Sequence, residues 1–349
     1  MKGLLVHVGA DTSNLGVVGP VFQDASFEFL PVDNSYGIEK RTYSDFAARN
    51  IRFGQKLGDY LPSDKANAPV HFDPDFDNCT YGQHGGAYPR VQTLRKLAEG
   101  DALFFFASLA SYDSSVYEHK DTLLRNYQLG KKNKYVIGVF TVQGVADVWI
   151  LKTTLPLAFA LLNVMFLEEE GKAPLEMRDY KEELEILKEY GFITKDGGSY
   201  RLTRHEEGGA RSGQEIAQVI SDLWPEDEAS QRTLLEKGLM SFNVLSGNVT
   251  EDDVRLNHHY QRLRPLDFDY FVIIKGDPNR SCILTHAIRL TDRFEGFGFR
   301  LNKLGQSIIR KASDSMRGAR WINEDAVSIL VNEITETNDL VGSKLQHLT

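Results

Sequence analysis

Carboxylates alternate with other residues in a short segment that contains a proline, His71-Phe-Asp-Pro-Asp-Phe-Asp-Asn78. Carboxylates spaced in this way can bind Mg²⁺ or Ca²⁺, or can give and take protons. An EF-hand loop would place a glycine at its sixth position, where this segment has Asn78. An Asx-capped turn explains the spacing without an ion. We therefore predict no metal, and keep Asp73 and Asp75 as candidate catalytic residues.

A loop rich in glycine and tyrosine follows directly, Thr80-Tyr-Gly-Gln-His-Gly-Gly-Ala-Tyr88. Glycines let a backbone approach a ligand closely. A flat base held between Tyr81 and Tyr88, with its edge read by Gln83, would use all of these properties. A surface loop whose tyrosines merely cover the core accounts for the same residues. The candidate base- or nucleotide-binding residues of this loop are Tyr81, Gly82, Gln83, His84 and Tyr88.

Two further polar segments lie near the end of the chain. Asn257-His-His-Tyr260 offers two imidazoles. Read as a strand, it points them to opposite faces, so a shared metal is not expected. His258 becomes the third catalytic candidate. Lys275-Gly-Asp-Pro-Asn-Arg-Ser281 follows an apolar run and can grip a phosphate, but it lacks the spacing of a P-loop. These segments add to the binding set Asn257, Lys275, Asp277, Arg280 and Ser281.

The net charge of −9 argues against a phosphate-binding protein only if the charge is spread evenly. It is not, because residues 168–189 are acidic whereas residues 300–320 are basic. Solvated surface charges are one explanation of the basic segment. A phosphate-binding strip next to Trp321 is the other. Its predicted phosphate-binding residues are Arg300, Arg310, Lys311 and Arg317.

The elements that must position these residues are β-rich at both ends of the chain. Apolar, β-branched or aromatic runs predict strands at 2–8, 27–32, 101–106, 135–142, 269–275 and 281–288. Residues 34–89 have no sustained periodicity, and a loop of that length is usually functional or contains elements that the sequence does not reveal. The middle of the chain predicts a helix, a charged helix, a hairpin at 192–203 and a helix at 213–223, which is the order of a winged helix. A last amphipathic helix covers 323–337.

These elements predict an α+β protein. Residues 1–150 and 241–349 form a discontinuous core domain, and residues 151–240 form a mostly helical insert with a hairpin. The 349 residues are 42% hydrophobic and 26% charged, which is typical of a soluble protein. We find no signal peptide and no apolar stretch long enough to span a bilayer. Cys79 and Cys282 lack the spacing of a zinc site, so we expect a reduced, cytoplasmic protein that needs no cofactor.

Five segments together resemble a known family. They are LLVHVGADT, HFDPDFDNCTYGQ, LRKLAEGDALFFFASL, YVIGVFTV, and the paired NHHYQR and FVIIKGDPNRSCIL. They resemble the third class of nucleotide modification associated domains, which occur in prokaryotic and viral DNA-modification systems. The resemblance implies a nucleic-acid context. A shorter likeness, Gly100-Asp followed by an aromatic strand and a V-I-G-V strand, is similar to EVE and other PUA-like domains. It implies a mixed sheet or small barrel that holds a modified base, and adds Ser108 to the binding set.

We therefore expect a protein that recognises a modified base or nucleotide in a DNA-modification or defence system. The alternative is an enzyme that itself alters a base or nucleotide, with Asp73, Asp75 or His258 transferring protons. A third reading is an assembly protein whose acidic insert helix docks a partner modification enzyme. The sequence leaves open whether the protein is an enzyme. A carboxylate and an imidazole that converge within about 3–5 Å would favour the enzyme.

Overall fold

The fold is taken from a computed structural model, which describes residues 1–9, 15–33, 41–51, 54–84, 89–111, 131–151, 155–171, 180–189, 191–197, 199–204, 213–222, 227, 230, 239–261, 263, 268–293, 299–309, 318–338 and 345. The chain forms two compact units. One contains Met1–Asp147, Asn243–Arg262 and Phe271–Thr349, and the other contains Val148–Phe242 and Leu263–Tyr270. The predicted domain boundaries at residues 150 and 240 stay a prediction.

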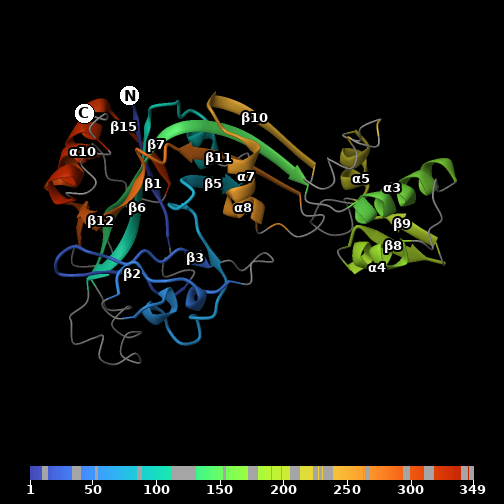
Figure 1. The fold of residues 1–349 in the computed structure, drawn as a ribbon, viewed down its shortest axis with the longest axis horizontal. Helices are drawn as coiled ribbons and strands as arrows, with labels where there is room; N and C mark the ends of the chain where they lie inside the picture. The colour runs from blue at the N-terminus through green and yellow to red at the C-terminus, as the bar shows by residue number, and fades with distance from the viewer. Residues whose placement is uncertain are drawn as a thin grey trace. The chain divides into compact units, whose positions relative to one another are not determined.

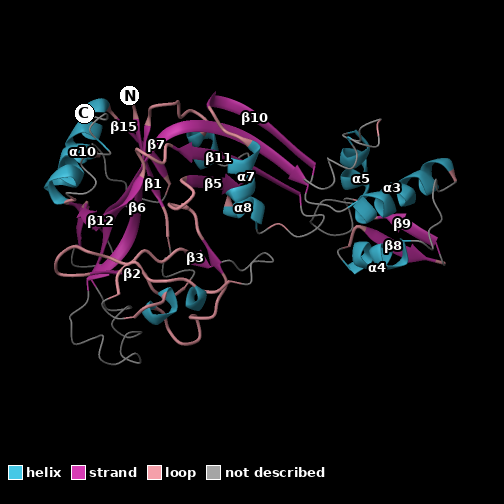
Figure 2. Cartoon of the chain, viewed as in Figure 1, coloured by secondary structure: helices cyan, strands magenta, loops and turns pink. Residues whose placement is uncertain are grey.

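One mixed sheet dominates the fold and curls into a half-barrel (Figures 1 and 2). Its strands are β1 (Gly3–His7), β2 (Gly19–Val21), β5 (Thr80–His84), β6 (Ala102–Ser111), β7 (Lys131–Leu151), β10 (Leu239–Gly247), β11 (Phe268–Gly276), β12 (Cys282–Arg289) and β15 (Ala319–Ile322). The main path runs β15-β1-β6-β7-β11-β5. β2 pairs with β6, and both β10 and β12 pair with β7. Segments from both ends of the chain therefore share one sheet, because β1 pairs with β15 as well as with β6.

The centre of the sheet is buried on both faces. Phe104, Phe105 and Phe106 of β6 are fully buried, because β1 and β7 flank the strand and other elements cover its faces. An unbroken apolar run is typical of such a strand. Helix α10 (Glu324–Thr337) packs its apolar stripe on β1 and β12. Helix α1 (Pro89–Leu94) buries Val91 and Leu94 in the same core. The α+β class and the mixed sheet are confirmed, whereas the PUA-like assignment stays a prediction.

Residues 34–89, which show no sustained periodicity, contain short elements. They are the 3-10 helices η1 (Tyr43–Asp45) and η2 (Leu57–Tyr60), β4 (Val70–His71) and β5, and β3 (Val32–Asp33) directly precedes them. Tyr43, Tyr60 and Val70 belong to a small hydrophobic core of their own. The sequence did not locate these elements, because two to five residues are too few to show a periodicity.

The second unit has its own hydrophobic core. Its described elements are α3 (Leu155–Glu170), α4 (Lys181–Glu189), β8 (Ile193–Asp196), β9 (Ser199–Leu202) and α5 (Gly213–Asp222). Leu161, Leu187 and Ile220 are fully buried together in it. The helix, helix, hairpin and helix follow one another in the predicted order, and the winged-helix assignment stays a prediction.

The remaining described elements are short. They are α7 (Glu251–Leu256), α8 (His258–Gln261), β13 (Thr291–Arg293), β14 (Phe299–Leu301) and α9 (Lys303–Ile308). Among the helices within the described ranges, none is long and apolar enough to cross a membrane. Of these elements, α8 matters most, because it brings both adjacent histidines to the loop between β4 and β5.

Candidate active site

The loop between β4 and β5 carries Asp73 and Asp75, and we call it the carboxylate loop. Phe76 anchors it to the sheet. The Phe76 ring meets the ring of Phe105 edge-on, with the two centroids 5.5 Å apart. Gly138 of β7 leaves room for this ring, since a Cβ there would lie 2.4 Å from a Phe76 ring carbon. Phe76 is therefore the residue of the alternating segment that holds the neighbouring carboxylates in place.

Asp75 is buried and closes a tight turn. Its Oδ1 accepts hydrogen bonds from the backbone N–H groups of Asp77 and Asn78, both at 3.0 Å. Its Oδ2 accepts a hydrogen bond of 2.8 Å from the side-chain amide of Asn78 and lies 3.7 Å from Nε2 of His258. Asp75 therefore braces the turn, and its second oxygen also lies beside an imidazole.

Asp73 makes a second contact of the same kind. Its Oδ1 accepts a hydrogen bond of 3.0 Å from the backbone N–H of Gly82. Its Oδ2 lies 3.7 Å from Nε2 of His259. Two aspartates two residues apart thus contact two consecutive histidines, each through one carboxylate oxygen.

The two histidines do not point to opposite faces, which corrects the strand expected for this segment. α7 ends at Leu256 with Asn257 as its C-cap, and His258 and His259 begin the short helix α8. Successive side chains of a helix are about 100° apart rather than 180°. Both histidines are buried, and both lie beside the same loop.

His71 completes a cluster of three imidazoles and two carboxylates. Its ring lies edge-on to the rings of His258 and His259, with centroids 5.8 and 5.0 Å away. One donor atom each from His71, Asp73 and His259 lie within 4.8 Å of one another. Within the part of the chain that the structure describes, these three residues form a group that could hold a metal ion.

The ring of His259 is closely packed. It stacks on Phe271 of β11, with an interplanar angle of 22° and centroids 5.3 Å apart. Gly82 also leaves room for the ring, since a Cβ there would lie 2.2 Å from His259 Cδ2. The backbone N–H of His259 donates to the side-chain oxygen of Asn257, whose amide donates to Thr80. Asn257 and Gly82 therefore position His259, whereas the sequence suggested that they bind a base.

The structure places the Tyr and Gln candidates of the loop differently from the base sandwich expected for them. Tyr81 is buried, and its ring packs edge-on against Phe105 at 5.4 Å. Burial raises the pKa of its phenol well above the ordinary value. Its hydroxyl donates to Gln83, which also accepts from Arg90. Tyr81 thus presents no open face to a base, and Tyr88 lies outside the described residues.

His84 stands apart from that buried network, because its side chain is exposed. Its ring centroid lies 6.0 Å from that of His259. His84 is therefore the solvent-facing imidazole next to the cluster.

The residues of 275–281 that were predicted to bind a phosphate contact different partners in the structure. The Lys275 ammonium forms a 2.7 Å ion pair with Asp253 and donates to the backbone oxygen of Asn78. Burial would by itself raise the pKa of Asp253, but the hydrogen bonds from Lys275 and Thr250 outweigh it and lower the pKa. Lys275 therefore ties α7 to the carboxylate loop.

The other two residues predicted to bind this phosphate, Arg280 and Ser281, lie in a turn. Arg280 is exposed and pairs with Asp277 at 3.6 Å. Ser281 is buried, and its hydroxyl accepts from the backbone N–H of Thr141. These contacts brace the turn against β7, and they do not join the turn to the imidazole cluster.

Ser108 belongs to a second polar cluster, which the sequence did not indicate. Its hydroxyl accepts a 2.7 Å hydrogen bond from the Lys134 ammonium, which lies 3.0 Å from Nε2 of His7. Ser108 and Lys134 are both buried and face each other across the β6–β7 ladder. The sequence does show a lysine, Lys134, directly before an apolar strand. Only the register of β6 and β7 shows that this lysine lies opposite Ser108.

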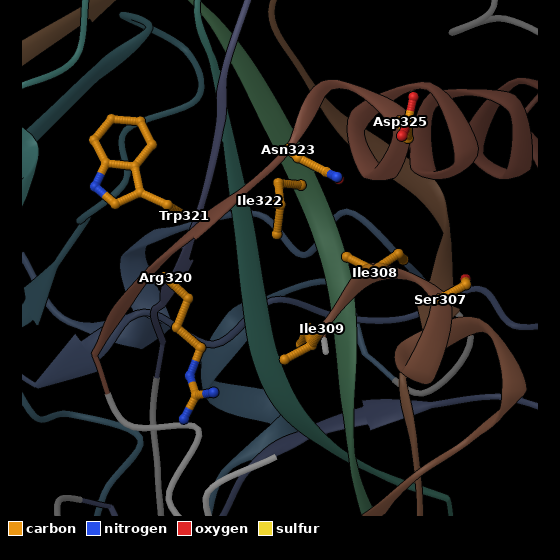
Figure 3. A pocket seen from close by; sticks show the side chains of 8 residues that line it. All are labelled: Ser307, Ile308, Ile309, Arg320, Trp321, Ile322, Asn323 and Asp325. Carbon is orange, nitrogen blue, oxygen red and sulfur yellow. The ribbon is translucent and has the colours of Figure 1, made fainter. Parts of the chain in front are cut away.

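The basic segment is described only at its two ends. Arg300 in β14 is exposed, whereas Arg310, Lys311 and Arg317 lie outside the described residues. A cavity of about 740 Å³ lies between the end of α9 and β15 (Figure 3). Arg320, the exposed Trp321 and apolar side chains such as Ile309 line it, and the side chains of Arg320 and Trp321 point in different directions. An arginine and an indole at one cavity are groups that can bind a phosphate and stack on a base.

A comparison with known protein families identifies the family of this chain. The family model described as nucleotide modification associated domain 3 matches residues 2–208. The matched region includes the carboxylate loop and the first half of the sheet. The chain belongs to this family, whose context is nucleotide modification. No curated protein and no solved structure matches the chain.

Proposed function

We propose that this protein is an enzyme that chemically alters a nucleobase or nucleotide, and that Asp73, Asp75 and His258 lie at its reacting site. One observation carries the proposal: the buried Asp75 lies 3.7 Å from His258, and beside it the half-buried Asp73 lies 3.7 Å from His259. The family supplies the nucleotide context. Imidazoles oriented by carboxylates are typical of sites that transfer protons during catalysis.

The roles of the two residues of the first pair follow from their contacts. Asp75 accepts hydrogen bonds at both oxygens, so it is held as an acceptor and positions its neighbour. His258 is then the residue that takes a proton from, or gives one to, the substrate. The division resembles that of other oriented imidazoles, where the aspartate fixes the ring and the ring carries the proton.

Recognition of a modified base without chemistry is the second candidate. Trp321 and Arg320 at the cavity beside the basic segment favour it. We propose that this surface binds nucleic acid or a nucleotide, with Arg300, Arg310, Lys311 and Arg317 contacting phosphates. A PUA-like half-barrel, a winged-helix second unit, a partner modification enzyme docked on α4 and a cytoplasmic location belong to the same proposal.

The test is a comparison of nucleosides in cells that express the full chain and in cells that do not. DNA digests and acid-soluble nucleotides are analysed by mass spectrometry. We expect an altered nucleoside or nucleotide mass with the wild type, and none with Asp75→Asn or His258→Gln. Asp64→Asn and His286→Gln are the matched controls, since both residues lie outside the site and Asp64 is exposed. Unchanged profiles together with binding to modified DNA would favour recognition instead.

A further inference from the structure

We propose that His71, Asp73 and His259 bind one divalent first-row transition-metal ion. This inference rests on the proposed function only in placing the ion at the reacting site, because the binding itself is measurable without turnover. It departs from the prediction, made from the sequence, that this segment binds no metal. The donor set is two imidazole nitrogens and one carboxylate oxygen from two segments of the chain that the fold brings together.

The distances fit a site that closes on an ion. At metal–ligand bonds of about 2.0–2.1 Å, neighbouring donors of a tetrahedral site lie about 3.4 Å apart. Oδ2 of Asp73 and Nε2 of His259 are 3.7 Å apart, so this pair needs to move by only a few tenths of an ångström. All the donor atoms lie within 4.8 Å of one another. Small side-chain rotations therefore bring the widest pair together.

Two of the ligands are already held in the required orientation. Gly82 donates its backbone N–H to Oδ1 of Asp73, which fixes the carboxylate and directs its other oxygen to His259. The ring of His259 stacks on Phe271 and lies close to the bare Cα of Gly82. Groups that fix the orientation of a ligand in this way are typical of metal sites.

The neighbouring pair, Asp75 and His258, is less suited to bind a metal ion. Both oxygens of Asp75 already accept hydrogen bonds from Asp77 and Asn78, which hold the carboxylate in a turn. A metal bound there would have to displace those donors. Asp75 and His258 therefore remain beside the ion rather than on it, which leaves His258 available to a substrate.

The ligand types select the class of metal. Two imidazoles with one carboxylate suit Zn²⁺, Fe²⁺ and similar ions, whereas Mg²⁺ and Ca²⁺ prefer shells made of oxygen. Three protein ligands are also the number found in catalytic sites, where the remaining position holds water or substrate. The site is therefore expected to bind an ion that keeps at least one position open.

The experiment uses the full chain, freed of metal with a chelator and titrated with Co²⁺ and Zn²⁺. We expect one ion per chain, Co²⁺ absorption bands of a low-coordinate site, and at least ~100-fold weaker binding in Asp73→Asn and His259→Gln, since even changes behind the ligands cost about 10–100-fold. His258→Gln and His286→Gln are the matched controls and should retain the ion. Binding by the wild type that is unchanged in both ligand variants would overturn the proposal, as would no binding of either ion.

A measurement on the wild type alone covers the case in which the variants do not fold. X-ray absorption at the zinc edge should show two imidazoles and one carboxylate oxygen, and any other first shell would overturn the assignment. The outcome is separable from that of the proposed function. A bound ion with unchanged nucleosides defeats the proposed function alone, whereas a product that depends on His258 in a metal-free protein defeats only the metal site.

Discussion

Nε2 of His258 lies 3.7 Å from Oδ2 of Asp75, although one residue follows β4 and the other begins α8. The same carboxylate receives hydrogen bonds from Asp77 and Asn78. One aspartate therefore closes a turn and lies next to an imidazole from a distant segment of the chain.

Replacement of Asp75 by alanine should destabilise the fold as well as the site. It leaves the donors of the turn without their acceptor, and each buried donor left in this way costs about 1–3 kcal/mol. We expect the free energy of unfolding, measured by urea denaturation, to fall by about 2–3 kcal/mol. Asp64→Ala, in an exposed position, should change it by less than about 0.5 kcal/mol. Equal effects of the two substitutions would contradict the bracing role.

Gly82→Ala should disturb His259 more than it disturbs the sheet. The added Cβ would lie 2.2 Å from His259 Cδ2, and the same ring is already stacked on Phe271. Crowding of this kind costs about 1–3 kcal/mol. We expect a folded protein by circular dichroism that has lost most of its affinity for Co²⁺ in a titration. Undiminished Co²⁺ affinity would show that the ring has room to move.

Glu28 should make stability depend on pH. Burial raises the pKa of its carboxyl from 4.5 to about 7, against hydrogen bonds from the backbone of Asn50 and Arg49. The unfolded chain loses this proton near pH 4.5 and the folded chain near pH 7. Between these values the folded state binds more protons, so the free energy of unfolding falls as the pH rises.

The measurement is urea denaturation of the wild type and Glu28→Gln at pH 4 and pH 8. The advantage of the variant should grow by roughly 3 kcal/mol, at most, from the lower pH to the higher. Glu99→Gln, at an exposed position, is the control and should show no such trend. A constant difference between wild type and Glu28→Gln would rule out the raised pKa.

Ser108→Ala tests the buried polar cluster. The substitution removes the hydroxyl that accepts from the Lys134 ammonium at 2.7 Å. Because the ammonium is buried, we expect a loss of about 1–3 kcal/mol in the free energy of unfolding. Ser108→Thr keeps the hydroxyl and should lose less. A Ser108→Ala protein as stable as the wild type would show that His7 satisfies the ammonium by itself.

The basic segment should give DNA binding that weakens steeply with salt. The log–log slope should be near −0.9 for each phosphate contacted. Arg310→Gln and Lys311→Gln should each flatten the slope by roughly one unit, measured by fluorescence anisotropy with unmodified and modified DNA. Lys65→Gln, outside the segment, should leave the slope unchanged. If neither Arg310→Gln nor Lys311→Gln changed the slope, these two residues would be solvated surface charges that do not contact phosphates.

Local sequence patterns determined much of the secondary structure. The apolar runs at 101–106 and 135–142 lie in β6 and β7, and the amphipathic pattern at 323–337 became α10. The motifs also identified the family, which the match over residues 2–208 bears out. These signals are local, because a strand or helix is set largely by the residues within it. The same reasoning selected Asp73, Asp75 and His258 as candidates from residue type alone.

Only the tertiary structure decided which of these residues meet. His71 and His259 joined the site because β4, α8 and the β5–β11 pair lie together, and no local pattern encodes that contact. The adjacent histidines could be paired with different aspartates only once the backbone was known to be helical rather than extended. Tyr81 likewise belongs to the core, because its ring packs edge-on against Phe105. Contacts between residues far apart in sequence depend on the packing of the whole sheet, which short-range periodicity does not contain.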